Sequence, residues 1–183
     1  MDVVVAEECA RRLLTVLPRR LTHVASVAHR AGDVAQALGL DVDLVVTSAW
    51  LHDIGYAPAT AATGFHPLDG ARFLRAQGVD ERVVNLVAHH SHAVLEAEER
   101  GVDRELLAEF PLDQSLPHDA LCFCDMTTGP DGQQMVVRDR LAEIRERYGP
   151  HDLVTRFITR AEPLIVETVD RVESQLVAAA QSR

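Results

Sequence analysis

Leu51-His52-Asp53-Ile54-Gly55 is the stretch that decides how this sequence is interpreted. It ends a run of mostly apolar residues, so at least one of the two polar side chains is expected to face the interior. A buried His-Asp pair costs free energy unless a charge compensates it, and a divalent cation does so well. Further histidines and aspartates lie before and after the pair at intervals that suit one metal site: His23, His66, His89, His90 and Asp125. The pattern predicts a metalloprotein.

The hydrophobic pattern predicts an all-α fold. Apolar residues recur at helical spacing along nearly the whole chain, and no two alternating runs are joined by a hairpin turn. A chain of 183 residues with 47% hydrophobic residues can bury one core but is short for two domains. We therefore expect a single helical-bundle domain over residues 1–183, with about seven to nine helices.

Glycine, proline and capping residues set the expected helix boundaries. Gly39 ends the second helix, and Asp41 or Asp43 caps the third. Pro163 is expected to divide or kink the last helical segment. Residues 55–65 follow the His-Asp pair directly and contain turn-forming residues, so we expect a loop that borders the site. We expect helices at about 2–17, 19–38, 44–51, 67–78, 80–90, 117–126 and 133–148, a broken, charged helical segment at 96–110, and one or two helices at 152–180.

Charge and composition exclude several classes of partner. The chain carries 28 acidic residues against 18 basic ones, all of them arginine, for a formal net charge of -10. It has no basic stripe of the kind that neutralises nucleic-acid phosphates, so we expect no nucleic-acid polymer as a partner. No stretch reaches the ~18 consecutive apolar residues of a membrane span, and the N-terminal residues lack the basic start of a signal peptide. We expect a cytoplasmic protein without a membrane partner, and the sequence leaves a homo-oligomer open.

The order of the histidines and aspartates resembles the HD superfamily of metal-dependent phosphohydrolases. In that family a first His precedes the His-Asp doublet, and two further His and a distant Asp follow in some members. The His-x-x-x-Gly-Ala element and the pair His90-Ser91 look nearest to the bacterial diadenosine-tetraphosphate hydrolases. The resemblance implies one HD domain with its core at about residues 20–126, on which C-terminal helices 133–180 pack. The matching elements are Arg20-Leu21-Thr22-His23-Val24, Leu51-His52-Asp53-Ile54-Gly55, His66-Pro67-Leu68-Asp69-Gly70-Ala71 and Cys124-Asp125.

The same resemblance implies that these side chains hold one or two divalent cations. Imidazole and carboxylate ligands without thiolate suit Mn, Fe, Co, Ni or Zn better than Mg or Ca. Asp53 would bridge two cations and, with His52 beside it, form the catalytic pair. The cations would acidify water and neutralise charge on the phosphoryl oxygens. The implied ligands are His23, His52, Asp53 and Asp125 for a first cation, and Asp53, His66 and His90 for a second.

The adjacent His89 and His90 cannot both aim at one point on a regular helix, because neighbouring residues diverge by about 100°. With the valines and the leucine of residues 83–87 as the buried face, His90 lies roughly 40° from its centre and His89 roughly 140°. We therefore predict His90 as the ligand. His89 is expected behind the ligands or facing solvent, and becomes a ligand only if the helix ends at the pair. His92 is expected to be solvated.

We expect a metal-dependent phosphohydrolase that cleaves a phosphoester or phosphoanhydride of a nucleotide or another small phosphorylated metabolite. Arg20 and Arg72 are candidates for binding the substrate phosphate, although each also fits a solvated helix face. Glu96, with its acidic neighbours at 98 and 99, is expected on an exposed charged face. Two alternatives remain: a di-iron oxygenase with the same ligand set, as in some relatives of this fold, and a non-catalytic module that binds a metal or ligand for regulation.

Overall fold

The structure, a computed structural model, describes residues 1–112 and 114–181. Ten α-helices and two 3-10 helices build these residues, which contain no β-strand, only an isolated bridge between Thr128 and Gln134. The predicted all-α class is confirmed. None of the described helices is long and apolar enough to cross a membrane. The elements are α1 (Val3–Leu14), α2 (Pro18–Leu38), α3 (Val42–Leu51), η1 (Ile54–Tyr56), α4 (His66–Ala76), α5 (Glu81–His89), η2 (His90–His92), α6 (Ala93–Arg100), α7 (Asp103–Glu109), α8 (Leu116–Met126), α9 (Val137–Tyr148) and α10 (Leu153–Gln181).

Caps and turns place the first helices close to their expected positions. Gly39 ends α2 in the left-handed conformation, with φ 66°. Of the two candidate caps, Asp41 performs the role, because its carboxylate accepts a hydrogen bond from the Leu44 N–H at 3.1 Å. α1 ends at Leu14 instead of residue 17, since the N–H of Leu17 closes a turn on the Leu14 carbonyl before α2 begins.

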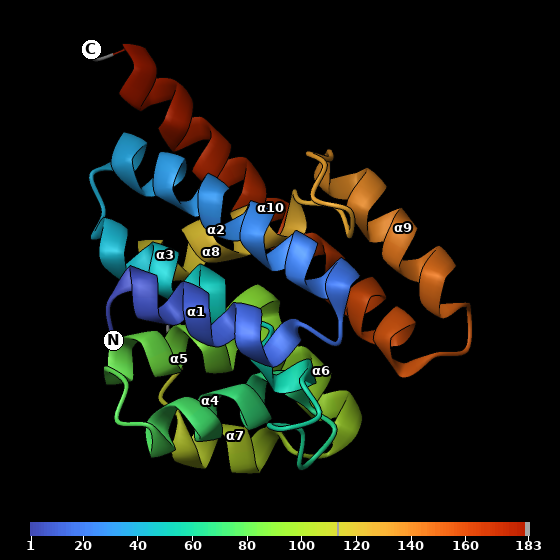
Figure 1. The fold of residues 1–183 in the computed structure, drawn as a ribbon. Coiled ribbons are helices and arrows are strands. Elements are labelled where there is room, and N and C mark those ends of the chain that lie inside the picture. The colour runs from blue at the N-terminus through green and yellow to red at the C-terminus, as the bar shows by residue number, and fades with distance from the viewer. Residues whose placement is uncertain (113, 182–183) are drawn as a thin grey trace.

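α3 is the central helix of the bundle. It packs against α1, α2, α5 and α8, as Figure 1 shows, and residues 47–51 are buried on every side. Because α3 ends at Leu51, His52 and Asp53 emerge in the middle of the surrounding helices. The fold thus brings the doublet within reach of side chains from α2, α4, α5 and α8.

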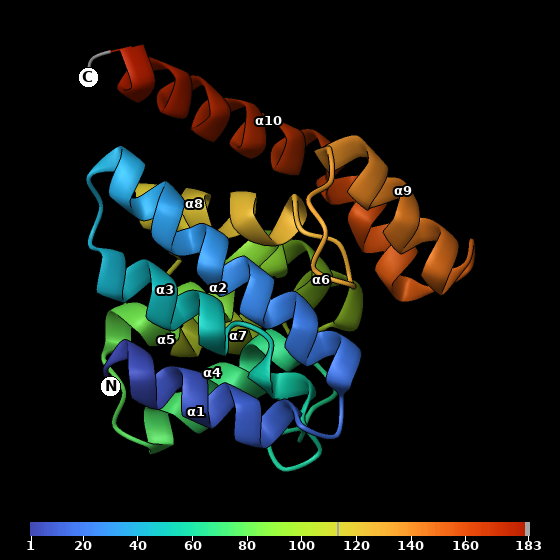
Figure 2. The ribbon, with the colours of Figure 1, turned by 45° about the horizontal axis from the view of Figure 1, so that its top comes forward.

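α9 and α10 complete the described part of the chain. Figure 2 shows α10 along one side of the bundle and α9 beside the first part of α10. Pro163 lies inside α10, which continues unbroken from Leu153 to Gln181, so the chain is not divided there and only a bend is visible. The reason lies in packing: Phe157 before the proline and Ile165 after it are both buried, and this holds both halves of the helix on the bundle.

Two interruptions separate α5, α6 and α7. Ser91 and His92 both adopt left-handed backbone conformations, with φ 50° and 60°, directly after α5. Such conformations cost about 1–3 kcal/mol each in residues other than glycine, so surrounding contacts must hold them. Gly101, with φ 72°, then divides the charged segment into α6 and α7. The charged segment is thus broken, as the sequence predicts, and the described residues form ten α-helices where about seven to nine are expected.

Candidate metal centre

Two groups of three side chains converge at the centre of the bundle. In each group, one ligand atom per residue lies within 4.8 Å of the other two. The groups are His23, His52 and Asp125, and Asp53, His66 and His90. They bring together all six predicted ligands from α2, the end of α3, α4, the end of α5 and α8. Five of the six are buried, and the side chain of His66 is 11% exposed.

Main-chain carbonyls orient three of the imidazoles. A carbonyl oxygen only accepts hydrogen bonds, so each of these Nδ1 atoms carries a proton and each Nε2 keeps its lone pair in the neutral ring. Histidines that bind metals commonly show this arrangement, because the second nitrogen fixes the tautomer and the direction of the first. The Nδ1–H groups donate from His23 to Gly129 at 3.1 Å, from His52 to Ala49 at 2.7 Å, and from His90 to Val87 at 2.6 Å.

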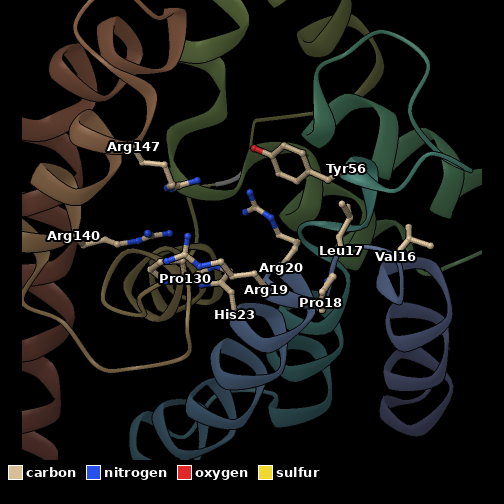
Figure 3. A pocket seen from close by; sticks show the side chains of 10 residues that line it. All are labelled: Val16, Leu17, Pro18, Arg19, Arg20, His23, Tyr56, Pro130, Arg140 and Arg147. Atoms are coloured by element: carbon tan, nitrogen blue, oxygen red, sulfur yellow. The ribbon is translucent and has the colours of Figure 1, made fainter.

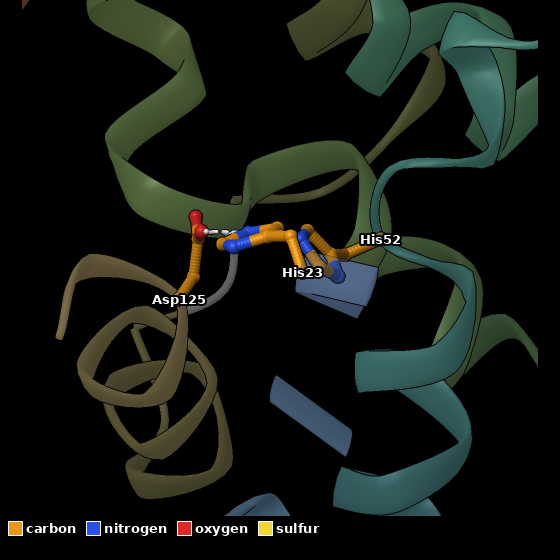
Figure 4. Close-up of side chains that lie close together, drawn as sticks. All are labelled: His23, His52 and Asp125. Atoms are coloured by element: carbon orange, nitrogen blue, oxygen red, sulfur yellow. Dashed lines mark hydrogen bonds and ion pairs between the residues drawn. The ribbon is translucent and has the colours of Figure 1, made fainter. Parts of the chain in front are cut away.

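The first group places lone pairs opposite one another. His23 Nε2 lies 3.0 Å from Asp125 Oδ1, and His52 Nε2 lies 3.9 Å from the same oxygen. Figure 4 shows the three side chains turned toward a common point. His52 Nε2 is buried, and no described residue forms a hydrogen bond with it. Neutral rings facing a carboxylate through their lone pairs repel it, so this arrangement calls for a proton or a cation between them.

Asp53 connects the two groups through its two oxygens. Oδ1 lies 3.3 Å from His66 Nε2 and 4.0 Å from His90 Nε2. Oδ2 faces the other group, 3.4 Å from His52 Nε2 and 4.0 Å from His23 Nε2. The two imidazole nitrogens of the second group are only 3.1 Å apart. A carboxylate with one oxygen toward each group is suited to bridging two cations.

Burial and neighbouring charges shift the pKa values of these side chains. Burial opposes ionisation of Asp53, but the charges of Arg20 and His52 hold its pKa well below the usual range. Burial lowers the pKa of His90 to about 4, and the pKa of His66 also lies well below its ordinary value for that reason. The second group therefore combines an ionised carboxylate with two neutral imidazoles. This is the protonation state in which a metal binds.

His52 differs from its neighbours in its protonation. Burial disfavours its charged form, but Asp53 outweighs that effect and raises the pKa of His52 to about 9. A proton on Nε2 occupies the place that a cation takes in a metal-loaded centre, so the two compete. Together, the unpaired Nε2, the opposed lone pairs and the mixed imidazole and carboxylate donors fit a divalent transition-metal ion.

A close backbone contact positions His66 against Asp53. A Cβ atom on Gly55 would lie 1.9 Å from the carbonyl oxygen of His66 and 2.8 Å from the amide nitrogen of Gly70. Only glycine allows η1 and α4 to approach this closely. Tyr56 then stacks on the His66 ring, with ring centroids 3.9 Å apart and an angle of 17° between the planes.

His89 is buried and lies in neither group of ligands, so the solvent-facing alternative is wrong. Its Nε2 bonds the carbonyl of Phe110 at 3.0 Å. The angular argument does not apply, because α5 ends at His89 and His90 no longer has helical dihedral angles. His90 joins the ligand group because the chain turns there.

The HD domain family matches residues 20–161, which is more than half of the chain. The chain belongs to the HD domain family. HD domains bind divalent metals and are typically metal-dependent phosphohydrolases, and the two groups described above could hold such ions here.

The curated relatives of this HD domain are much longer proteins, and only a part of each one matches this chain. A tRNA (cytidine(56)-2'-O)-methyltransferase of Thermoplasma volcanium is 39% identical over 79 residues, 43% of this chain and 23% of its own length. Ribonuclease Y of Rubrobacter xylanophilus is 40% identical over 74 residues, 40% of this chain and 14% of its own length. Ribonuclease Y of Thermobifida fusca is 40% identical over 87 residues, 47% of this chain and 17% of its own length. The matched segments thus span less than a quarter of these relatives. No solved structure gives a significant match.

The two arginines predicted to bind substrate lie in different places in the HD domain. Arg20 reaches the metal centre, where its guanidinium donates to Asp53 Oδ2 at 2.7 Å. Arg72 does not reach the centre, because it forms ion pairs with Glu105 and Glu109 of α7. α7 lies against the outer side of α4 and holds Arg72 there.

A cavity of about 410 Å³ lies beside the centre and is lined by residues that the sequence reasoning missed. Figure 3 shows Arg140 and Arg147 of α9 extending toward Arg20, Tyr56 and His23. A narrower cavity continues from there to the second group of ligands, and the same two arginines line it. Their seven-residue spacing, which puts them on one face of a helix, is the signal that could have identified them.

Two further side chains were missed or placed wrongly. Ser91 donates its hydroxyl to Asp125 Oδ2, so the residue after His90 also orients the last ligand. Glu96 is buried and lines the narrower cavity, contrary to the expected exposed face. Burial raises the pKa of Glu96, although its ion pair with Arg100 at 2.7 Å opposes the shift.

Proposed function

We propose that this HD domain hydrolyses a phosphoester or phosphoanhydride bond of a nucleotide or another small phosphorylated metabolite. The observation that carries the proposal is Asp53, whose two oxygens face two groups of metal-binding side chains at the end of an arginine-lined cavity. That arrangement has the components that phosphoryl transfer to water needs: a cation site, fixed positive charge and an enclosed space.

In this proposal, different residues would hold the cations and contact the phosphoryl group. His23, His52 and Asp125 would hold one cation, and Asp53 would share it with a second cation held by His66 and His90. Bound cations lower the pKa of water and neutralise charge on the phosphoryl oxygens. Arg20 bonds Asp53 and lines both cavities, so it would place a fixed positive charge beside the phosphoryl group. No side-chain nucleophile is required.

The size of the cavity favours a small substrate over a polymer. A volume of about 410 Å³ corresponds to a small-molecule site and accommodates a group of about nucleoside size. The chain has a net charge of -10, and a polymer footprint needs a basic surface well beyond one cavity. The relatives named ribonuclease Y nevertheless make an RNA phosphodiester a substrate that the experiment should include.

Metal analysis followed by a substrate panel tests the proposal. Protein purified without chelator is analysed for metals, stripped, and reloaded separately with Mn, Fe, Co, Ni, Zn and Mg. Each form is assayed with p-nitrophenyl phosphate, nucleoside mono-, di- and triphosphates, a dinucleoside polyphosphate and a short oligoribonucleotide. We expect metal-dependent release of phosphate or nucleoside monophosphate, with oxygen from heavy-oxygen water in the phosphoryl product after one turnover.

Other outcomes of the same panel would overturn the proposal. Iron-dependent oxygen uptake without phosphate release would indicate the di-iron oxygenase. Stoichiometric metal without turnover of any substrate would indicate a regulatory module. Cleavage of the oligoribonucleotide alone would retain the reaction type but exclude the small substrate.

A further inference from the structure

We propose that Arg140 and Arg147 of α9 form a second anion subsite, which binds a phosphate group of the substrate other than the one that is cleaved. This inference rests on the proposed function and narrows its substrate class to compounds with at least two phosphoryl groups. Water adds its oxygen to one phosphorus atom, the bond from that atom to the leaving oxygen breaks, and the leaving group takes up a proton. The second phosphate stays on α9 during this exchange.

The charge of the wider cavity carries the first step of the argument. Arg19, Arg20, Arg140 and Arg147 line it together with His23 and Tyr56, and none of the described residues that line it is acidic. Acidic residues outnumber basic ones by 28 to 18 in the whole chain, so this lining is far more basic than the average surface. A cavity with such a lining attracts an anion.

The availability of the individual guanidinium groups is the second step. Arg19 is already bound through two nitrogens to Asp131, at 2.8 and 2.9 Å, and Arg20 is bound to Asp53. Arg140 is only 4% exposed, yet its Nε has no hydrogen-bond partner among the residues that the structure describes. A buried N–H of a charged group without an acceptor costs free energy, so Arg140 is adapted to an acceptor that binds in the cavity.

Glu143 is the third element, because it holds the two arginines in position. Its carboxylate accepts from Arg140 Nη1 and, at 2.8 Å, from Arg147 Nε. The guanidinium of Arg147 also lies over the ring of Tyr148, 4.7 Å from its centroid. One carboxylate thus fixes two guanidinium groups and leaves a net positive charge, as a site that binds a phosphate requires.

The position of α9 decides which phosphate it binds. Arg20 marks the scissile position through its bond to Asp53, and it lines the same two cavities as Arg140 and Arg147. The α9 arginines lie across the cavity from Arg20 in Figure 3 and are bonded to Glu143 rather than to a metal ligand. A substrate with a single phosphate, bound at the metals, would place no phosphate on the α9 arginines. A second phosphate in the same substrate would reach them.

Binding of inorganic pyrophosphate to metal-stripped protein tests the subsite without relying on turnover. Isothermal titration of wild-type protein is compared with Arg147→Gln and with Arg138→Gln, an exposed arginine of the same helix that lies outside both cavities. We expect the Kd for pyrophosphate to be at least fivefold higher in Arg147→Gln and unchanged in Arg138→Gln. Equal affinity in all three proteins, or no binding to the wild type, would overturn the inference.

A kinetic comparison separates this inference from the proposed function. Arg147→Gln should raise KM for a nucleoside diphosphate at least fivefold more than it raises KM for p-nitrophenyl phosphate, which has a single phosphoryl group. Arginine-dependent pyrophosphate binding without any phosphatase activity would retain the subsite and overturn the proposed reaction. Activity that is equally insensitive to Arg147→Gln on both substrates would retain the reaction and overturn the subsite. Glu143→Gln, which keeps its size, provides a second variant whose thermal unfolding is followed alongside.

Discussion

Two clusters of histidine and aspartate lie on opposite sides of the Ser91–His92 turn, and they satisfy their polar atoms in different ways. The metal centre lies on one side, with lone pairs that face each other. On the other side, His118 bonds the carbonyl of His89 at 3.0 Å and His92 bonds the Thr168 hydroxyl at 3.2 Å. Asp119 completes the second cluster through an ion pair with an arginine.

The difference teaches how to separate metal ligands from structural histidines of equal burial. In the second cluster the Nε2 atoms of His118 and His92 meet a main-chain carbonyl and a hydroxyl group. His118 Nδ1 lies 3.6 Å from Asp119, whose carboxylate bonds Arg171 Nε at 2.8 Å. In the metal centre, the main chain occupies only Nδ1 and leaves Nε2 toward carboxylates and other imidazoles. Both clusters contain histidine and aspartate, so the decisive property is what the Nε2 atoms face: carboxylates and other imidazoles in the metal centre, and main-chain or hydroxyl groups in the second cluster.

Replacing one aspartate in each cluster should give the largest contrast. Asp53→Ala removes the carboxylate shared by both groups, so we expect metal affinity to fall by at least about a hundredfold at both sites. Asp119→Ala should keep full metal content and lower the free energy of unfolding by about 1–3 kcal/mol, because Arg171 loses its partner. Metal analysis and urea unfolding of both variants measure the contrast. Full metal content in a folded Asp53→Ala protein would contradict the assignment.

A histidine pair should show a smaller, selective effect. His23→Ala removes a ligand of the first group only, so we expect the protein to keep the second cation and lose roughly half of its metal. His118→Ala lacks a bond to the main chain and should keep both cations. Metal stoichiometry after dialysis distinguishes the two variants. Equal metal loss in both would contradict the assignment of metal binding to one cluster and a structural role to the other.

The adjacent His89 and His90 test the boundary between the clusters. His90→Ala should reduce occupancy of the second metal, since Nε2 of His90 faces His66 and Asp53. His89→Ala should leave metal content unchanged and reduce stability by about 1–3 kcal/mol, because the buried carbonyl of Phe110 loses its donor. Equal loss of metal in His89→Ala and His90→Ala would contradict a boundary between the two clusters at this pair.

The smallest expected effect is a pH dependence of the stability of metal-stripped protein, to which His52 and His92 contribute with opposite signs. The pKa of His52 is raised to about 9, above its ordinary 6.5, so its contribution is complete below pH 6.5 and is lost as the pH rises through 9. Burial lowers the pKa of His92 to about 4, and the neighbouring His118 adds to the shift. The neutral ring of His92 therefore stabilises the fold above pH 6.5, and this contribution is lost as the pH falls through 4.

Urea unfolding over this pH range checks both signs. His52→Asn should flatten the alkaline side of the stability profile, and His92→Asn should flatten the acid side. Identical profiles for the wild type and both variants would contradict the opposite signs.

The all-α class and the grouping of the ligands could be predicted because both depend on local pattern. Helical spacing of apolar residues identified the elements, and the His-Asp doublet at the end of the apolar α3 identified the centre. The environment of His89 could not be predicted, because the argument assumed a continuing helix. Ser91 and His92 adopt left-handed conformations that residues other than glycine rarely show, so the sequence carries little signal for the turn.

The arginines of α9 illustrate a second limit of local pattern. Arg140 and Arg147 face Arg20 only because α9 packs beside the first part of α10, which in turn lies on the bundle. That packing joins residues more than a hundred positions apart, so the seven-residue spacing indicates that the two arginines share a helix face but not what that face meets. The buried Glu96 was placed on an exposed face for the same reason, since α10 covers α6.

The contact at Gly55 also has a consequence for how this chain can vary. A library that replaces every residue in turn should find position 55 as intolerant as the ligands themselves, although its residue carries no chemistry. Any side chain there would push the backbone of His66 away from Asp53. By contrast, Gly64, with nothing near its missing Cβ, should accept asparagine. Among variants under selection, position 55 should therefore remain glycine, because only the absence of a side chain keeps His66 close to Asp53 in the metal centre.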